Sequence, residues 1–401
     1  MKFAHIADCH IGSWRDPKLK DLSMQAFIKA INISIEQKVD FVLIAGDLFH
    51  TSLPGIDFLK ETTKKLRELR DLKIPVYIIP GSHDFSPSGK TILDVLEEAG
   101  LMINVVKGTV ENEKLKLKFT IDEKTGAKIT GLLGKRGMLE RTYYEKLNKN
   151  YLEAEDGFKI FMFHTSLTEL KPKALELMES SPISFLPQGF DYYAGGHVHI
   201  VEHKNLEGYK NVTLPGPLFP ANFYELEFLK QGSFYIYNHG KVEFVPIVIK
   251  KVFPIKINAK HKNPEEVYEE LIDIIKTSDF KDQIVLLRVF GKLKTGKPSN
   301  IDFKSLFEKL YEKGAYFVMK NTSKLTSEEF EEIKIKSDSI DEVENEILKE
   351  HLGQIKTSFS KNEEKIAKEL LKSFAQEKGE GEKVYEFNER MKKEIDELLE
   401  L

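Results

Sequence analysis

Histidine and aspartate gather in five short polar segments of this chain, and the pattern indicates metal chemistry. The segments are Asp8-Cys9-His10, Gly46-Asp47, Gly81-Ser82-His83-Asp84, His164 and Gly195-Gly196-His197-Val198-His199. Imidazole together with carboxylate is a ligand set for manganese, iron or zinc rather than for calcium. Asp8 and His10 are two positions apart, so on an extended segment they point the same way and can bind one ion, and His197 and His199 repeat this spacing. We interpret the set as that of a two-metal hydrolase.

Asp47 is the residue best placed to join two metal ions. Hydrolysis of a phosphodiester needs a nucleophile at neutral pH and cations that neutralise the phosphoryl oxygens, and two ions about 3.5–4 Å apart provide both. Only a carboxylate or a hydroxide can hold two cations so close together. Asp47 follows Gly46 at the end of a strong predicted strand, so we expect it to bridge the ions.

Short apolar runs precede these polar segments and predict buried strands. The runs are residues 3–7, 41–45, 76–79, 160–163 and 192–194. Parallel strands that are covered on both faces have continuous apolar sequences. Ligands bind at the carboxyl ends of such strands. We therefore expect the aspartates and histidines to meet at one edge of a sheet.

The rest of the chain predicts three regions. Helical periodicity at 21–37, 57–72 and 91–99 alternates with the first strands, which indicates βαβ units. Later strands at 115–120, 127–133, 209–214, 233–238 and 241–250 favour a second, more antiparallel sheet packed on the first. A small α/β module follows at 264–319, and helical apolar stripes at 340–355 and 366–374 follow it. Because 401 residues exceed one ordinary core, we expect domains at 1–250, 251–325 and 326–401.

Composition excludes several protein classes. The chain is 41% hydrophobic and contains no run of eighteen apolar residues, so no membrane span is expected. Its single cysteine, Cys9, excludes an internal disulfide, and its first residues do not form a signal peptide; we expect the cytoplasm. The net charge is −4, with −9 from Thr326 to Leu401 and +5 in the remainder. A mildly basic body is compatible with phosphate binding.

The five segments, in this order, resemble the signature of calcineurin-like metallophosphoesterases. That signature is Asp-x-His, Gly-Asp, Gly-Asn-His-Asp, a lone His and Gly-His-x-His. Within this superfamily, Gly46-Asp47-Leu48-Phe49-His50 and the opening Met1 to Ile11 look like the meiotic-recombination-eleven nucleases of DNA double-strand break repair. The resemblance is strong over the first 230 residues and rests on layout thereafter. It implies a four-layer α/β/β/α sandwich with a small α/β capping domain and a C-terminal helical tail.

The resemblance also implies roles for individual residues. It implies one metal held by Asp8, His10, Asp47 and His199, and another held by Asp47, Ser82, His164 and His197. His83 would protonate the leaving oxygen while Asp84 holds its ring, and His50 would contact the phosphate. Family members usually have asparagine where this chain has Ser82, so the second metal is expected to bind more weakly or through a water.

The implied activity is a manganese-dependent DNA nuclease, both a 3′-to-5′ double-strand exonuclease and a single-strand endonuclease. Two Mn²⁺ ions per chain are expected, with Mg²⁺ as a weaker substitute. The implied partners are DNA ends and single strands, a coiled-coil ABC-type ATPase bound by residues 326–401, and a second copy of the chain. The copies would pair through the helices at 21–37 and 57–72. A nucleoid-associated protein of a prokaryotic cytoplasm is expected.

Two other functions stay open. The chain could be a different metallophosphoesterase that acts on cyclic nucleotides or phosphoproteins, although those lack a region like 255–401. It could also be a non-enzymatic scaffold for DNA ends, because Ser82 weakens one metal site. The helical tail either folds back on the body or docks a partner protein.

Other polar and aromatic residues have more ordinary interpretations. The remaining histidines, His5, His203, His239, His261 and His351, are interpreted as structural or surface residues. Trp14 and Arg15 follow the first polar segment and are candidates for the rim of a DNA groove. The aromatic set Phe219, Phe223, Tyr224 and Phe228 is interpreted as core or interface.

Overall fold

A computed structural model describes residues 1–86, 91–172, 177–327, 363–374, 376, 382 and 384–399. The chain divides into two compact units, Met1–Glu329 and Phe330–Leu401. Among the described helices, none is long and apolar enough to cross a membrane.

The first sheet of the larger unit has a parallel centre. Its strands, in spatial order, are β14 (Lys241–Ile247), β13 (Gly232–Asn238), β1 (Lys2–Ile6), β2 (Phe41–Ala45), β3 (Val76–Ile79) and β4 (Ile103–Asn104). The connections from β1 to β4 carry α1 (Pro17–Glu36), α2 (Ile56–Asp71) and α3 (Ile92–Glu98). Strands β1 to β4 pair in parallel, which confirms the predicted βαβ units.

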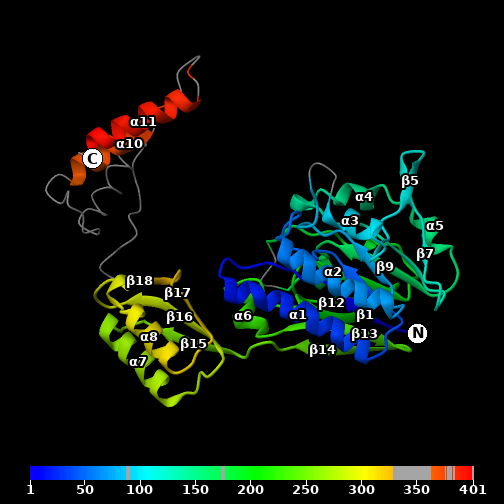
Figure 1. The fold of residues 1–401 in the computed structure, drawn as a ribbon, viewed down its shortest axis with the longest axis horizontal. Helices are drawn as coiled ribbons and strands as arrows, with labels where there is room; N and C mark the ends of the chain where they lie inside the picture. The colour runs from blue at the N-terminus through cyan, green and yellow to red at the C-terminus, as the bar shows by residue number, and fades with distance from the viewer. Residues whose placement is uncertain are drawn as a thin grey trace. The chain divides into compact units, whose positions relative to one another are not determined.

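The second sheet is also parallel at its centre. Its order is β11 (Val201–Leu206), β12 (Tyr209–Pro215), β10 (Tyr192–Gly196), β9 (Lys159–His164), β8 (Lys128–Gly131) and β7 (Thr120–Ile121). Only the two outermost pairs are antiparallel. A hairpin of β5 (Gly108–Glu111) and β6 (Lys114–Leu117) and the short helices α4 (Arg141–Glu145) and α5 (Lys149–Glu153) accompany this sheet (Figure 1).

The strands explain the layers, because alternate side chains of a strand point to opposite faces. In β2, Val42 and Ile44 belong to the core shared with α1, α2 and α3. Phe41, Leu43 and Ala45 belong to a second core, shared with β9 and β10 of the other sheet. On the far face of that sheet, a third core contains side chains of α4 and α5. The layers are therefore α/β/β/α, which confirms the predicted sandwich.

Three strands lie in a different sheet from the one predicted. Residues 115–117 of the predicted strand 115–120 belong to β6, which forms a separate two-stranded sheet with β5. The segments 233–238 and 241–250 were expected in the second sheet, but β13 pairs with β1, and β14 pairs with β13, at the edge of the first. β13 is buried along most of its length, whereas β14 is mostly exposed, as befits an edge strand. The antiparallel character of these two strands was predicted correctly, but the expectation of a more antiparallel second sheet is wrong, because its three central pairs are parallel. Sequence alone does not identify the partner strand.

Capping residues set where the helices begin. α1 starts at Pro17, earlier than the predicted Asp21, because the Asp16 side chain accepts a hydrogen bond from the Lys18 backbone N–H and proline suits the first helical position. α3 starts after Thr91, whose side chain and that of Asp94 form a reciprocal capping box.

Residues 252–327 form a small module with its own sheet and core. The parallel strands are β15 (Val252–Asn258), β16 (Ile284–Leu293), β17 (Phe317–Asn321) and β18 (Leu325–Ser327), and the helices are α7 (Pro264–Thr277) and α8 (Phe303–Glu312). The module has a hydrophobic core that is separate from the cores of the sandwich. Two residues of β16, Ile284 and Leu286, pack instead in the core of the first sheet. The predicted boundary near residue 250 stays a prediction, since the module belongs to the same compact unit as the sandwich.

The smaller unit contains two described helices, α10 (Glu363–Phe374) and α11 (Val384–Leu398). Ser373 of α10 donates a hydrogen bond to Glu394 of α11 at 2.8 Å. The predicted apolar stripe at 366–374 lies on α10, whereas the stripe at 340–355 lies outside the described residues.

His5 is a core histidine, as interpreted from the sequence, and it predicts a pH dependence of stability. It is fully buried, its Nδ1 lies 3.0 Å from the Tyr192 hydroxyl, and burial lowers its pKa to about 3. The unfolded chain takes up a proton on this ring near pH 6.5, so the free energy of unfolding falls as the pH drops from about 6.5 towards about 3.

We expect the parent chain to lose about 2 kcal/mol more than His5→Gln between pH 7 and pH 5, because each pH unit of the window contributes about 1.4 kcal/mol. Urea unfolding of both proteins in a metal chelator measures the difference. Parallel losses in the two proteins would contradict this expectation.

Candidate functional site

The five polar segments meet where the carboxyl ends of the two sheets face each other. β1, β2 and β3 of the first sheet lead into the segments that contain Asp8, Asp47 and His83. β9 ends at His164, and β10 leads directly into His197. The expected single edge of one sheet is therefore wrong in detail, because the two sheets contribute jointly to the site.

Five residues of this site adopt backbone conformations that are rare outside glycine. Their φ angles are 49° for Asp8, 42° for His10, 54° for Asp47, 100° for His197 and 52° for His199. Such strain persists where the surrounding structure imposes it and is common at functional sites. The expectation that Asp8 and His10 stand on an extended segment is therefore wrong, because the chain turns at each of them.

The first group of candidate ligands consists of Asp8, His10 and His199. Ligand atoms of all three lie within 4.8 Å of one another. The two Nε2 atoms of His10 and His199 are 2.8 Å apart, and Nε2 of His199 lies 3.9 Å from Oδ1 of Asp8. Two imidazole nitrogens and a carboxylate oxygen thus point at one small volume.

The second group consists of Asp8, Asp47 and His164, again within 4.8 Å of one another. Oδ2 of Asp47 lies 3.2 Å from Nε2 of His164 and 3.6 Å from Nε2 of His10. Asp47 therefore reaches a histidine of each group, which is the position that a bridging carboxylate requires.

Contacts at Nδ1 orient the rings of His164 and His199. Nδ1 of His164 donates to the Ala45 carbonyl at 2.8 Å, and Nδ1 of His199 lies 2.9 Å from Oε1 of Glu225. Such contacts leave the Nε2 lone pair free to bind a metal. Nε2 of His164 is buried and has no well-formed hydrogen bond among the described residues. The site therefore fits a cation.

Glu225 is the site residue that sequence analysis missed. It lies on α6 (Phe223–Leu229), where Asn222 caps the helix by accepting a hydrogen bond from the Glu225 backbone N–H at 2.9 Å. Asn-x-x-Glu is a common helix start, so the pattern predicts a cap and nothing more. Oε2 of Glu225 also accepts from the Ala221 N–H at 2.8 Å, which fixes the carboxylate beside His199.

Burial and neighbouring charges determine the protonation of the carboxylates. Burial alone would raise the pKa of Asp47, but His164 and His10 hold it well below its ordinary value, so Asp47 is ionised. Burial and the charge of Asp47 raise the pKa of Asp84 to about 7. Burial also raises the pKa of Asp8, although His199 and His164 oppose this.

Ser82 and His197, the remaining predicted ligands, lie at the same centre. The Ser82 hydroxyl donates to Oδ2 of Asp47 over 3.5 Å, and the His197 ring lies 5.0 Å from the His164 ring, centroid to centroid. The His197 backbone N–H also donates to the Asp8 carboxylate at 2.9 Å. All seven predicted ligands are therefore brought together, and their metal binding stays a prediction.

His83 is oriented differently from the prediction. Nδ1 of His83 lies 2.8 Å from the carbonyl oxygen of His50, and the two rings stack at 4.9 Å. Asp84 instead accepts hydrogen bonds from the backbone N–H groups of Leu48, Phe49 and Gly81 at 3.0–3.2 Å. The expectation that Asp84 holds the His83 ring is wrong. Its carboxylate instead connects the loop that follows β2 with the loop that follows β3.

Gly46 leaves room for His164, which predicts a sensitive position. Its φ is +87°, and a Cβ there would lie 2.2 Å from Nδ1 of His164. We expect Gly46→Ala to displace this ring and to slow hydrolysis of a model phosphodiester roughly 10²-fold, since misplacement by about 1 Å can cost that much.

Gly126→Ala is the matched control for that rate measurement. Its φ is +74°, but nothing lies within 4 Å of a Cβ, so it adds backbone strain without a clash. Equal rates in the two variants would show that the space beside His164 is unimportant.

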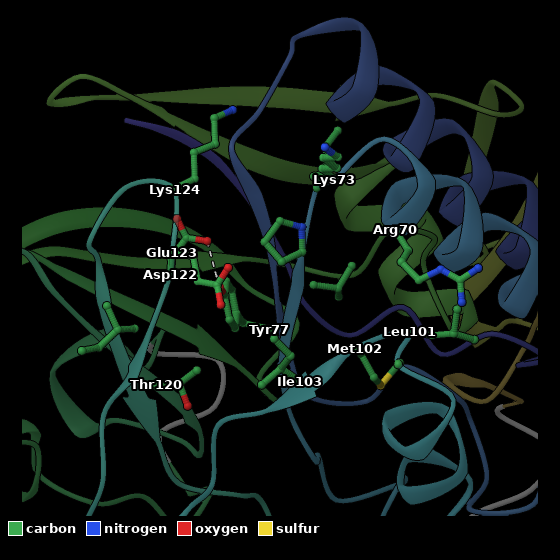
Figure 2. Close-up of a pocket in the computed structure, with 15 residues that line it drawn as sticks. Arg70, Lys73, Tyr77, Leu101, Met102, Ile103, Thr120, Asp122, Glu123 and Lys124 are labelled. Atoms are coloured by element: carbon green, nitrogen blue, oxygen red, sulfur yellow. Dashed lines mark hydrogen bonds between the residues drawn. The ribbon is translucent and has the colours of Figure 1, made fainter.

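The described residues also form a separate cavity of about 760 Å³, and Figure 2 shows the side chains that line it. It is lined by the end of α2, the start of β3 and the turn between β7 and β8, and the buried Asp122 accepts a hydrogen bond from Tyr77 at 2.8 Å. None of the predicted site residues lines it. The cavity lies at the amino end of β3, whereas the site lies at the carboxyl ends of the parallel strands.

The chain is similar in sequence to known proteins. The family described as calcineurin-like phosphoesterase matches residues 1–201. Three similar curated proteins are each named DNA double-strand break repair protein Mre11. The one from Archaeoglobus fulgidus is 28% identical over 84% of this chain and 77% of its own length. The one from Sulfolobus acidocaldarius is 25% identical over 94% and 99%. The match to Methanopyrus kandleri is 28% identical over 57% of this chain and about half (51%) of that relative.

Proposed function

Because this chain belongs to the calcineurin-like phosphoesterase family, we propose that it is a metal-dependent DNA nuclease of double-strand break repair. The curated relatives, which bear the predicted family's name, support the substrate. The observation that carries the chemistry is the position of Asp47, whose carboxylate lies within 3.6 Å of both His10 and His164. The finer proposal is manganese-dependent 3′-to-5′ exonuclease and single-strand endonuclease activity.

The donor atoms divide between two cation sites. Asp8, His10 and His199 would hold one manganese ion, His164, His197 and Ser82 would hold the other, and Asp47 would join them. Bound cations there would supply a nucleophile at neutral pH and neutralise charge on the phosphoryl oxygens. Glu225 and the Ala45 carbonyl contact the Nδ1 atoms of His199 and His164, which leaves their Nε2 atoms available to hold a cation.

His83 is the proposed proton donor to the leaving sugar oxygen. With Nδ1–H donated to the His50 carbonyl, the protonated ring can release the proton on Nε2. The His83 backbone N–H donates to Oδ1 of Asp47 at 2.7 Å, which ties the donor to the bridging carboxylate. The His50 ring, stacked on His83, is the proposed contact to the phosphate. Asp84 acts only by holding the two loops in place.

The proposed partners follow from the predicted family. Residues 326–401 would bind a coiled-coil ATPase of the ABC type, and α1 and α2 would pair two copies of the chain. Pairing would bring two active sites, and thus two DNA ends, side by side near the nucleoid. Light scattering of the full chain at micromolar concentration tests the pairing, and a monomeric mass would contradict it.

Ser82 provides the specific reason to keep a second function in view. If the shorter hydroxyl leaves the second cation unbound, the chain would serve as a scaffold for DNA ends rather than as an enzyme. Counting manganese ions per chain separates the two functions, because two ions support the enzyme and one supports the scaffold.

We expect Ser82→Asn to tighten binding of the second manganese ion about tenfold. A carboxamide oxygen reaches further than a hydroxyl, and the Ser82 oxygen now lies 3.5 Å from Asp47. Outer contacts and ligands at such sites typically change metal affinity by about 10–100-fold. Manganese titration by calorimetry measures the change. The same manganese dependence in parent and variant would show that position 82 is not a ligand position.

A substrate panel tests the proposed function against other phosphoesterases. The full chain with manganese is assayed on single-stranded DNA, duplex DNA, a cyclic nucleotide and a phosphopeptide. We expect the highest kcat/KM on DNA. Preferential hydrolysis of the cyclic nucleotide or the phosphopeptide would replace the nuclease with one of the alternative phosphoesterases.

A further inference from the structure

Two exposed aromatic rings stand out on α6. Tyr224 is 55% exposed and Phe228 is 70% exposed, and their centroids lie 5.9 Å apart with the planes only 2° from parallel. Residues four apart on a helix lie above one another on the same face. The two rings are therefore stacked on one face of α6, and both are largely open to solvent.

The fold itself does not need this surface. On the other sides of α6, Leu226 is fully buried, and Phe223 lies under the Arg288 guanidinium at 5.1 Å. Glu227 pairs with Arg288 at 2.8 Å and with Lys256 at 3.5 Å, which attaches the helix to the 252–327 module. The packing of α6 is thus complete without Tyr224 and Phe228.

The same helix borders the candidate site. Tyr224 is adjacent in the chain to Glu225, whose carboxylate lies 2.9 Å from Nδ1 of His199. Consecutive residues point about 100° apart around a helix, so the aromatic face begins one residue from the face that meets the cation ligands. Trp14, next to the first polar segment, donates a hydrogen bond to the Pro220 carbonyl at 3.0 Å and secures the approach to α6.

Parallel aromatic faces beside a phosphodiester site match the chemistry of an unpaired nucleic acid strand. Every base has a π-face, so stacking on aromatic side chains is tolerant of sequence. Lys230, exposed at the end of α6, adds a positive charge that suits the strand's phosphates. A base of duplex DNA is already stacked on its neighbours and cannot use such a surface.

We propose that Tyr224 and Phe228 form a stacking surface for a base of single-stranded DNA next to the phosphate that is cleaved. This inference rests on the proposed nuclease function and adds to it a residue-level basis for preferring unpaired ends. Of the two interpretations of this aromatic set, core or interface, core is excluded for Tyr224 and Phe228, which are largely exposed, whereas Phe219 is buried.

Binding of single-stranded oligonucleotides tests the proposal. The double variant Tyr224→Leu/Phe228→Leu keeps apolar side chains but removes the π-faces. It is compared with its parent in a His83→Ser background, so that the DNA is not cleaved during measurement. We expect the double variant to bind about tenfold more weakly or worse, which is the usual effect of losing one aromatic stacking partner. Phe244→Leu, which alters an aromatic residue 45% exposed on β14, serves as the matched control and should bind like the parent.

A second series replaces one nucleotide at a time with an abasic site. At one position, we expect the abasic site to weaken DNA binding by the parent but not to weaken binding by the double variant any further. The abasic site and the double substitution would each remove the same stacking contact, so their effects would not add. A merely structural role would give independent losses at every position and would overturn the proposal. Equal affinity of parent and double variant would also overturn it, with the nuclease function intact. A parent that binds no single-stranded DNA would overturn the proposal as well, and cleavage of duplex DNA would then show whether the nuclease function stands.

Discussion

Asp47→Asn should abolish the activity, lowering the rate of DNA cleavage on the order of 10³-fold or more. The Asp47 carboxylate lies 3.2 Å from His164 and 3.6 Å from His10, and it accepts a hydrogen bond from the His83 backbone N–H at 2.7 Å. Asparagine has the same shape, so the fold should persist. Its neutral amide cannot bridge two cations, and we expect the bound manganese to fall from two ions per chain to at most one.

Metal analysis of the dialysed protein and cleavage rates together check this expectation. Asp122→Asn is the matched control, because Asp122 is also buried, yet its hydrogen bonds are to Tyr77 and Thr125 beside the separate cavity. That variant should keep both ions and most of the activity. An Asp47→Asn protein that retains two ions and cleaves DNA within tenfold of the parent would show that Asp47 is not the bridge.

His83→Ser should lower kcat about 10²–10⁴-fold while leaving the affinity for DNA nearly unchanged, as expected for a residue that acts as a general acid. The ring is held from Nδ1 by the His50 carbonyl, and its backbone contact to Asp47 does not depend on the side chain. Cations should therefore still bind. Single-turnover rates and a binding isotherm for the same DNA separate the two quantities.

His203→Ser provides the control for that experiment. His203 is a part-buried histidine on β11 whose Nδ1 lies 3.0 Å from the Thr213 hydroxyl. Its removal should alter neither kcat nor DNA affinity. A His83→Ser enzyme with parental kcat would require another proton donor, and a joint loss of binding would indicate that His83 holds the DNA instead.

Local sequence was sufficient to predict the strands that carry the site. Apolar runs such as 41–45 and 76–79 became β2 and β3 because both faces of these strands are covered, which leaves only apolar side chains in them. The polar residues that follow are likewise evident in the sequence, because charged and imidazole groups stand out directly after a buried strand.

Contacts between distant segments were less accessible. Pairing of β13 with β1 joins residues more than two hundred positions apart, and no local pattern encodes that register. Glu225 was missed for the same reason, since a helix-start signal hid its contact to His199. Asp84 was predicted to hold the ring of His83, its neighbour in sequence. The His83 ring contacts the carbonyl oxygen of His50 instead, and adjacency in sequence does not reveal that contact.

End-labelled duplex and single-stranded DNA, incubated with the full chain and manganese, test directly whether the chain is a metal-dependent DNA nuclease. We expect degradation of both substrates by the parent chain, no degradation without the metal, and none by Asp47→Asn. A parent chain that binds two manganese ions and leaves both DNAs intact would contradict this expectation.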